Sequence, residues 1–128
     1  MNVKDGFAMK YAIDNEYLIT IISGGTNEAV RKRLVKLGIN QVFLGSNNKI
    51  KELEKLAEEN NLKKEEILVM GDDILDIPIL KNAGISCCPQ DAVQEVKKIC
   101  DYVSFKKGGC GAVREIIEQV MKIQKKWI

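Results

Sequence analysis

The sequence has 128 residues, of which 45% are hydrophobic, and this is typical of one globular domain rather than of two domains or a disordered chain. Twenty basic and eighteen acidic residues leave a net charge of +2, which indicates neither a nucleic-acid nor a membrane-surface partner. No apolar run is long enough for a membrane span or a signal peptide, so we expect a cytoplasmic protein whose partner is a small molecule or another protein chain.

Short β-branched runs alternate along the chain with longer segments of helical period, and this alternation predicts an α/β fold. The predicted strands span residues 18–22, 41–44, 67–70, 85–87 and 102–104. The predicted helices span residues 6–15, 26–37, 49–60, 75–82, 92–99 and 112–127. The first and third strands are nearly all apolar, which favours a Rossmann-like parallel sheet with helices on both faces. We expect one domain over residues 1–128, although a doubly wound domain that opens on a helix is unusual.

The sequence contains no histidine, and this excludes Ser-His-Asp and Cys-His catalysis. The four cysteines show no CxxC pattern, so a zinc site is not indicated. We expect reduced structural thiols, as in cytosolic proteins, at Cys87, Cys88, Cys100 and Cys110. Any acid, base or nucleophile must then be a carboxylate, lysine, serine, threonine or cysteine.

Polar residues follow the first two predicted strands, at the edge where ligands of open parallel sheets bind. Ser23, Gly24 and Gly25 come after the first strand and offer a hydroxyl and backbone N–H groups to a phosphate. Lys49 begins the helix after the second strand, where the helix dipole disfavours a cation unless a negative group lies nearby. Each segment also has a purely structural interpretation, the first as a tight turn with a helix cap and the second as a solvated surface lysine.

Three carboxylates follow the third predicted strand, at Asp72, Asp73 and Asp76. Carboxylates so close together repel one another unless a hard cation lies between them. Mg²⁺ is the natural candidate, because it takes few protein ligands and completes its octahedron with water and phosphate oxygens. The alternative is that Asp73 caps the next helix and that the other two side chains are solvated.

A basic, glycine-rich loop precedes the last predicted helix and contains Lys106, Lys107, Gly108 and Gly109. Its backbone can approach an anion closely while a lysine supplies charge, or it can be a simple connection. Together with the hydroxyl, the lysine and the carboxylates of the earlier loops, it favours phosphoryl transfer from a small phosphate ester.

Four features in chain order, IISGG, Lys49, GDDILD and KKGGCGAVRE, resemble the haloacid dehalogenase superfamily of phosphatases. More narrowly, they resemble the capless branch that contains 3-deoxy-manno-octulosonate 8-phosphate phosphatase. The resemblance implies a haloacid dehalogenase-like fold and Mg²⁺-dependent hydrolysis of a small acidic sugar phosphate. It also implies a homo-oligomer, a tetramer, which covers the active site without a cap domain.

The resemblance assigns roles to single residues of the motifs. It implies that Ser23 and Gly24 hold the phosphoryl group, that Lys49 stabilises its charge and that Asp72 binds Mg²⁺. Asp73 and Asp76 are implied to support the metal site and to orient the lysine.

Four further residues are assigned to the substrate. Gly108, Gly109 and Arg114 match the C-terminal segment that, in this branch, forms part of the substrate site in the oligomer. Arg33 lies one turn from Lys36 on the predicted helix 26–37 and can reach a substrate carboxylate, or both can be solvated charges.

One motif of the family is not found in the 128 residues. The first motif, DxDG, supplies the nucleophilic aspartate and the general acid/base at the end of an apolar strand, whereas only four residues precede Asp5 and Gly6. We therefore expect a chain truncated at the N-terminus, lacking the family's first strand and hairpin, with little or no phosphatase activity. The family's first strand lies between those that end here at Ser23 and Asp72. The alternative to an enzyme is a non-catalytic module that binds metal or phosphate or serves oligomerisation.

A response-regulator receiver domain would also combine a parallel sheet with acidic residues and a lysine. Its acidic pair stands near the first strand and its lysine after the last. Here the order is Ser23, Lys49 and Asp72, so this interpretation is set aside.

Overall fold

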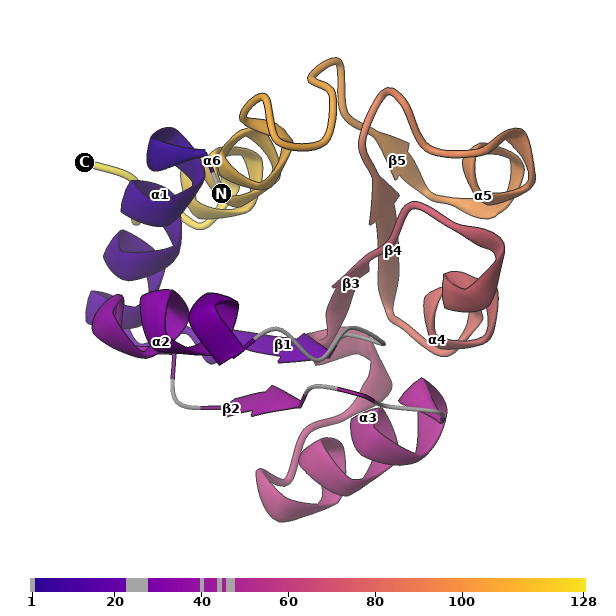
Figure 1. Ribbon diagram of the computed structural model, residues 1–128, viewed down its shortest axis with the longest axis horizontal. Helices are drawn as coiled ribbons and strands as arrows, with labels where there is room; N and C mark the ends of the chain where they lie inside the picture. Colours follow the sequence, from indigo (N-terminus) through magenta and orange to yellow (C-terminus); the bar gives the residue numbers. More distant parts are fainter. Residues whose placement is uncertain (1, 23–27, 40, 44, 46–47) are drawn as a thin grey trace.

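The computed structural model describes residues 2–22, 28–39, 41–43, 45 and 48–128, and Figure 1 shows how its elements are arranged. The strands are β1 (Thr20–Ile22), β2 (Gln41–Phe43), β3 (Leu68–Met70), β4 (Ile85–Cys88) and β5 (Tyr102–Val103). The α-helices are α1 (Val3–Asp14), α2 (Glu28–Lys36), α3 (Lys49–Glu59), α4 (Ile77–Lys81), α5 (Gln94–Ile99) and α6 (Ala112–Ile123). Two 3₁₀ turns, η1 (Lys64–Glu66) and η2 (Ile74–Asp76), precede β3 and α4. None of the helices in the described ranges is long and apolar enough to cross a membrane.

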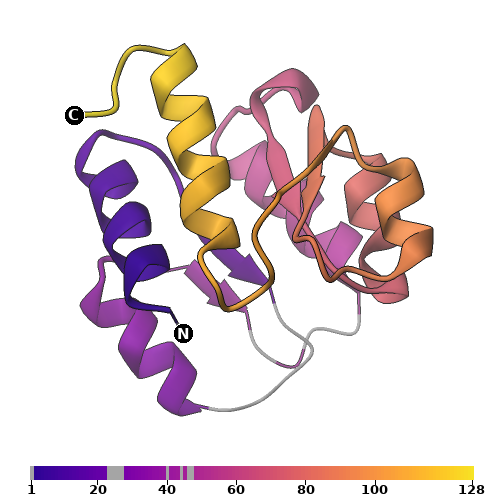
Figure 2. The ribbon, with the colours of Figure 1, turned by 90° about the horizontal axis from the view of Figure 1, so that it is seen from above.

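All the strand pairs are parallel, as the sequence predicts. β1 pairs with β2, with Ile21 opposite Val42, while β4 lies between β3 and β5. Among the described residues the strands form two separate sheets, because no ladder joins β1 to β3. Seen from above, α1 and α6 lie side by side next to the two-stranded sheet, and α4 and α5 lie beyond the three-stranded one (Figure 2).

Each sheet has its own hydrophobic core. Buried side chains from the two-stranded half form the first cluster, which contains Met9, Leu34, Ile39 and Val42. Buried side chains around β4 form the second cluster, which contains Leu80, Cys88, Ala92 and Val96. Each large apolar side chain so buried stabilises the fold by about 1.5–3 kcal/mol relative to exposure. The prediction that Cys87 and Cys88 are buried is confirmed, and all four cysteines are free thiols.

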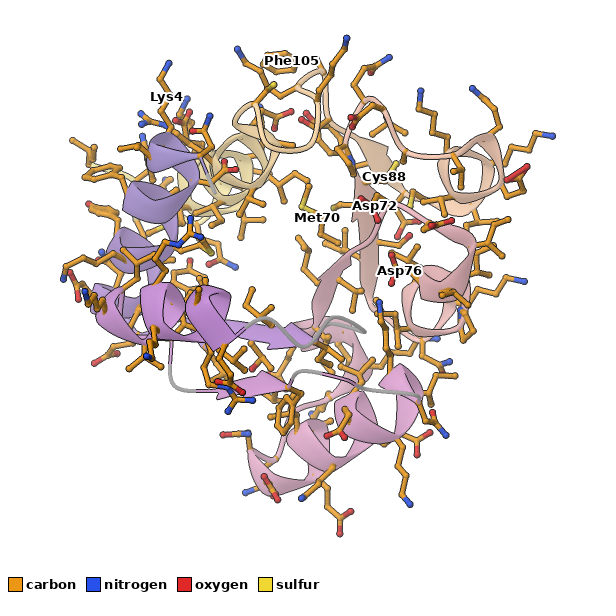
Figure 3. The ribbon with its side chains drawn as sticks, in the orientation of Figure 1. Lys4, Met70, Asp72, Asp76, Cys88 and Phe105 are labelled. Carbon is orange, nitrogen blue, oxygen red and sulfur yellow. The ribbon has the colours of Figure 1, made fainter. Side chains whose placement is uncertain are left out.

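β1 and β3, one strand from each sheet, are less buried than their apolar sequences predict. The residues of β1 and β3 are only half-buried, although both strands are almost wholly apolar. The side chain of Met70 lies on the side of β3 that faces α6 (Figure 3). Each of the two strands stands at the edge of its sheet among the described residues, so it is only partly covered.

α1 and α6 bring the two ends of the chain together. Asp5 of α1 is buried, and its Oδ1 accepts a hydrogen bond of 2.9 Å from the N–H of Arg114 in the first turn of α6. The N-cap residue of α6 is Gly111, which has no side chain to cap the helix. Asp5 therefore satisfies, from another helix, one of the N–H groups that a helix start leaves unpaired.

α1 begins earlier than predicted. The helix starts at Val3 rather than at residue 6, because the side chain of Asn2 caps it by accepting a hydrogen bond of 2.8 Å from the N–H of Lys4. The periodicity of apolar residues could not indicate this start, since the first turn carries exposed and charged side chains.

α6 ends earlier than predicted, at Ile123 instead of residue 127. Lys125 has a φ of 59°, in the left-handed region, so the helix cannot continue through it. The turn directs Trp127 back onto α1, where its ring packs edge-on against Tyr11 with the centroids 5.1 Å apart. Trp127 therefore serves the contact between the helices rather than the apolar face of α6.

Candidate active site

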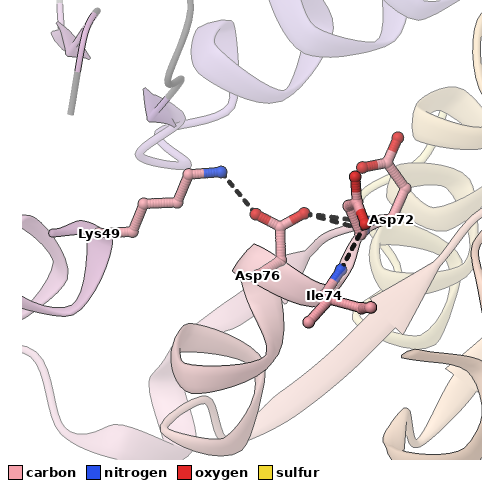
Figure 4. A network of polar contacts seen from close by, with 5 residues as sticks. Lys49, Asp72, Ile74 and Asp76 are labelled. Atoms are coloured by element: carbon pink, nitrogen blue, oxygen red, sulfur yellow. Dashed lines mark hydrogen bonds and ion pairs between the residues drawn. The ribbon is translucent and has the colours of Figure 1, made fainter. Parts of the chain in front are cut away.

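Lys49 and Asp76 form an ion pair between α3 and the segment that follows β3 (Figure 4). Lys49 is the first residue of α3, which Asn48 caps by accepting a hydrogen bond from the N–H of Lys51. Its Nζ lies 2.5 Å from Oδ1 of Asp76, and the two side chains are 20% and 10% exposed. The cation that the helix dipole disfavours therefore has a carboxylate partner that is largely shielded from water.

Asp76 also holds the backbone of the segment before it. Its Oδ2 accepts hydrogen bonds from the N–H groups of Asp72 at 3.0 Å and Asp73 at 3.2 Å. Burial alone would raise the pKa of Asp76, but the hydrogen bond from Lys49, the two N–H donors and the lysine charge lower the pKa below its ordinary value. Asp76 is thus an ionised carboxylate that fixes the lysine and the acidic loop at once.

Gly71 makes room for this network. A Cβ atom at Gly71 would lie 2.6 Å from Cβ of Asp76, which is closer than two carbon atoms can approach. The glycine of the GDDILD segment is therefore required by the close approach of Asp76 rather than by an unusual backbone angle.

Asp72 differs from Asp76 because it forms no ion pair with any of the described residues. Its side chain is exposed at the carboxyl end of β3 and points away from the lysine (Figures 3 and 4). Partial burial, followed by the charges of Asp76 and Asp73, raises the pKa of Asp72 above its ordinary value. Negative charge accumulates here, and a bound cation would relieve it.

Asp73 has a structural role in this arrangement. Its side chain accepts a hydrogen bond of 2.7 Å from the N–H of Ile74 and caps η2. This is the capping role that the sequence offers as the alternative for Asp73. A catalytic role for Asp73 stays a prediction.

The residues present fit Mg²⁺ in the chemistry of their donors. Asp72 offers a hard carboxylate oxygen, which Mg²⁺ prefers over nitrogen or sulfur. Within the described ranges, no three histidine, cysteine, aspartate or glutamate side chains are placed to hold one metal ion. A cation at Asp72 would therefore take its remaining ligands from water, phosphate or other parts of the protein, as Mg²⁺ commonly does.

The glycine-rich loop is held by a carboxylate that the sequence reasoning missed. The N–H of Gly108 donates a hydrogen bond of 2.8 Å to Oδ1 of Asp91, and the charge of Asp91 also contributes to the raised pKa of Asp72. Asp91 follows β4 at the sheet edge where Asp72 follows β3. Its place directly after a parallel strand could have identified Asp91 from the sequence. The Gly108 N–H is thus engaged by a carboxylate, and Gly109, with a φ of 75°, makes the turn.

The two predicted arginines are not brought to the acidic cluster. The guanidinium of Arg114 lies over the rings of Phe7 and Trp127, 5.5 and 5.7 Å from their centroids, and its Nε donates to Glu118 at 2.6 Å. Arg33 is exposed on α2. Their predicted contacts with a substrate stay predictions.

A model of the haloacid dehalogenase-like hydrolases matches residues 41–117, which include the Lys49, Asp72 and Asp76 network. The chain belongs to this family. Its predicted haloacid dehalogenase-like α/β fold is thereby confirmed.

Within the haloacid dehalogenase-like hydrolases, the chain is similar to phosphatases of one kind. The 3-deoxy-D-manno-octulosonate 8-phosphate phosphatase of Escherichia coli is 32% identical over 125 residues, which cover 98% of this chain and 66% of the relative. A crystal structure of the Yersinia pestis phosphatase has a TM-score of 0.96 and 29% identity over 98% of this chain and 68% of its own. The Moraxella catarrhalis phosphatase, solved with magnesium, phosphate and KDO, has a TM-score of 0.94 and 27% identity, and the match covers 98% of this chain and 72% of the other.

The two sheets of this haloacid dehalogenase-like chain keep the relative placement that they have in the solved relatives. A TM-score of 0.96 over 98% of the chain requires that both halves superpose together. The chain spans 66% of the length of the Escherichia coli relative. Ser23 and Gly24, the predicted phosphate-binding residues of the second motif, lie outside the described residues.

Proposed function

We propose that this chain provides the phosphate- and Mg²⁺-binding part of a phosphatase that acts on a small acidic sugar phosphate of the 3-deoxy-manno-octulosonate 8-phosphate type. The observation that carries the proposal is the ion pair of Lys49 with Asp76 beside Asp72, at the carboxyl end of β3. Three relatives in one branch of the family, two of them solved, support the substrate class.

Lys49 and Asp76 act together in this proposal. Asp76 holds the ammonium group at a fixed place, so that Lys49 meets the negative charge of a transferring phosphoryl group without having to reorganise. Ser23 and Gly24 would hold the same group through a hydroxyl and a backbone N–H. In the sequence Ser23 follows β1 and Asp76 follows β3. Ligands of open parallel sheets bind at such strand ends.

Asp72 would hold Mg²⁺ through its carboxylate. Bound there, the metal supplies positive charge to the phosphate oxygens and a template for the ester. The raised pKa of Asp72 and the magnesium ion bound to the Moraxella catarrhalis relative support this assignment. Asp73 and Asp76 keep the acidic loop in the required shape through their hydrogen bonds to backbone N–H groups.

The remaining predicted features concern the sugar acid and the assembly. Gly108, Gly109, Arg114 and Arg33 would contact the substrate. We propose that the protein acts in the cytoplasm as a homo-oligomer, a tetramer, whose neighbouring subunit covers the site in place of a cap. The resemblance of the sequence motifs to the capless branch supports this.

The nucleophile is proposed to come from outside these 128 residues. They contain no DxDG segment, and an aspartyl-phosphate cannot form without that carboxylate. No ladder joins β1 to β3 in the part of the chain that the structure describes, and their apolar side chains are half-buried. Both observations support a strand position between the two sheets. The 128-residue chain by itself is therefore expected to bind Mg²⁺ and phosphate with little or no turnover.

A complementation experiment tests the proposal. The chain is assayed for phosphate release from 3-deoxy-manno-octulosonate 8-phosphate with Mg²⁺, alone and with an added peptide that contains an apolar strand ending in DxDG. The matched control peptide carries NxDG, which keeps the strand and removes the nucleophile. We expect turnover only with the DxDG peptide. Binding of Mg²⁺ and phosphate without turnover under any condition would favour the non-catalytic module, and turnover by the chain alone would contradict the assignment of the nucleophile.

A further inference from the structure

The segment of residues 89–93, between β4 and α5, contacts two loops at the edge of the three-stranded sheet. The N–H of Val93 donates a hydrogen bond of 3.1 Å to the carbonyl of Asp72 in the acidic loop that follows β3. The N–H of Gln90 donates a hydrogen bond of 2.8 Å to the carbonyl of Lys106 in the glycine-rich loop that precedes α6. One short segment therefore bonds to both loops through its backbone.

Asp91 adds a side-chain contact between this segment and the glycine-rich loop. Its Oδ1 accepts a hydrogen bond of 2.8 Å from the N–H of Gly108. The contact is close, because a Cβ atom at Gly108 would lie 3.4 Å from Oδ1 of Asp91 and 3.7 Å from Cγ of Pro89. The carboxylate thus lies against the backbone of the loop, and a movement of the carboxylate would be felt at Gly108.

Asp91 also acts on the acidic loop through its charge. It forms no ion pair in the part of the chain that the structure describes. Burial and the charges of Asp76 and Asp73 are the larger causes of the raised pKa of Asp72, and the charge of Asp91 adds to them. A negative charge that disfavours the ionised form of Asp72 favours a cation at the same place, because the interaction changes sign with the charge.

We propose that Asp91 is a positioning residue that couples Mg²⁺ binding at Asp72 to the glycine-rich loop. Its charge strengthens the attraction of the acidic loop for the cation, and its hydrogen bond carries the response of the carboxylate to Gly108. The inference rests on the proposed function, because it takes Asp72 as the residue that holds Mg²⁺. It deepens that function, since the metal site and the loop assigned to the substrate then depend on each other, and such a dependence is reciprocal.

Two variants of Asp91 separate this coupling from a purely structural role, which would fix the loop and leave Mg²⁺ affinity unchanged. Asp91→Asn removes the charge but keeps a side-chain oxygen that can accept from Gly108. Asp91→Ala removes both the charge and the hydrogen bond. The matched control is Glu95→Gln, which removes one negative charge from an exposed residue of α5 that forms no ion pair with the described residues.

The first measurement is the Mg²⁺ affinity of the 128-residue chain, by calorimetric titration. We expect both Asp91 variants to bind Mg²⁺ about two- to fivefold more weakly than the unsubstituted chain, which is the range for interactions between exposed charges, and Glu95→Gln to bind it equally well. In about 1 M potassium chloride, where the screening length is about 3 Å, the difference should disappear. Equal affinities of Asp91→Asn and the unsubstituted chain at low salt would overturn the proposal, and so would a difference that persists at high salt.

The second measurement follows the NMR amide signals of Gly108 and Asp73 during a Mg²⁺ titration. In the unsubstituted chain both signals should shift along one saturation curve, whereas in Asp91→Ala the Asp73 signal should respond and the Gly108 signal should not. An undiminished response of Gly108 in Asp91→Ala would overturn the role of Asp91, because the backbone contacts alone would then connect the loops.

The two proposals fail in different ways. If no signal of the unsubstituted chain responds to Mg²⁺, the proposed metal site is wrong, and this inference with it. If Asp73 responds and Gly108 does not, the coupling alone is wrong. A dispersed NMR spectrum checks that each variant is folded, and Asp91→Asn, which keeps the shape of the side chain, still tests the affinity if Asp91→Ala does not fold.

Discussion

Nζ of Lys49 lies 2.5 Å from Oδ1 of Asp76, a residue 27 positions further along the chain. The contact joins the start of α3 to the turn after β3, so two strand ends share one ion pair. Both side chains are mostly buried, and Asp76 also bonds two backbone N–H groups. The pair thus has a structural as well as a chemical role, and its loss should be measurable in stability.

Asp76→Ala is expected to lower the free energy of unfolding by about 2–3 kcal/mol, somewhat below the value for a fully buried pair, because both partners keep some exposure. Urea denaturation followed by circular dichroism measures the change. The control is Asp14→Ala, which removes the exposed partner of Lys10 and should cost less than about 0.5 kcal/mol. Similar losses in the two variants would mean that Asp76 is not the centre of a buried network.

Asp72→Asn should stabilise the metal-free protein at neutral pH. The raised pKa of Asp72 means that its ionised form is disfavoured in the folded state, and the penalty is present above the raised pKa and absent below the ordinary value of 3.8. Mg²⁺ should raise the melting temperature of the unsubstituted chain and leave that of the variant nearly unchanged, because ligand binding stabilises only the form that binds. Equal responses to Mg²⁺ would remove Asp72 from the metal site.

The hydrogen bond from Tyr102 to Glu115, followed by burial, raises the pKa of Tyr102 to about 12. The contribution of this pair to stability is fully present below the unfolded value of 10.0 and is lost as the pH rises toward 12. An absorbance titration of the tyrosinates should therefore show one late step, which moves to lower pH in Glu115→Gln. A late step that persists in this variant would show that the hydrogen bond to Glu115 is not its cause.

The order of strands and helices could be predicted because apolar periodicity and turn residues are local properties of the sequence. Helix ends were less predictable where distant contacts decide them. Trp127 continues the apolar pattern of α6, yet the left-handed backbone at Lys125 returns it to α1. Periodicity cannot register such a turn, because a lysine carries no signal for a positive φ.

The candidate site could likewise be predicted from the sequence only in part. Motif spacing predicts that Lys49, Asp72 and Asp76 lie at one edge of the sheet, since all three follow ends of parallel strands. That Asp76 orients the lysine was implied by the resemblance to the phosphatases. Motif spacing gave no indication that Asp91 accepts a hydrogen bond from Gly108, or that the guanidinium of Arg114 lies over aromatic rings. These contacts depend on how loops and helices pack in three dimensions, which a single sequence does not encode in any local pattern.

Substitution by alanine should have opposite effects on stability at Gly71 and at Gly6. Gly71→Ala places a methyl group 2.6 Å from Cβ of Asp76, so it should displace the turn that Lys49 binds and destabilise the fold by about 1–3 kcal/mol. Gly6→Ala lies within α1, where the nearest atom of Leu37 is 3.5 Å away, and should stabilise the chain by about 0.5–1 kcal/mol through helix propensity. Thermal denaturation of the two variants side by side measures both. Destabilisation by both substitutions to the same extent would show that the close approach of Asp76 is not what requires Gly71.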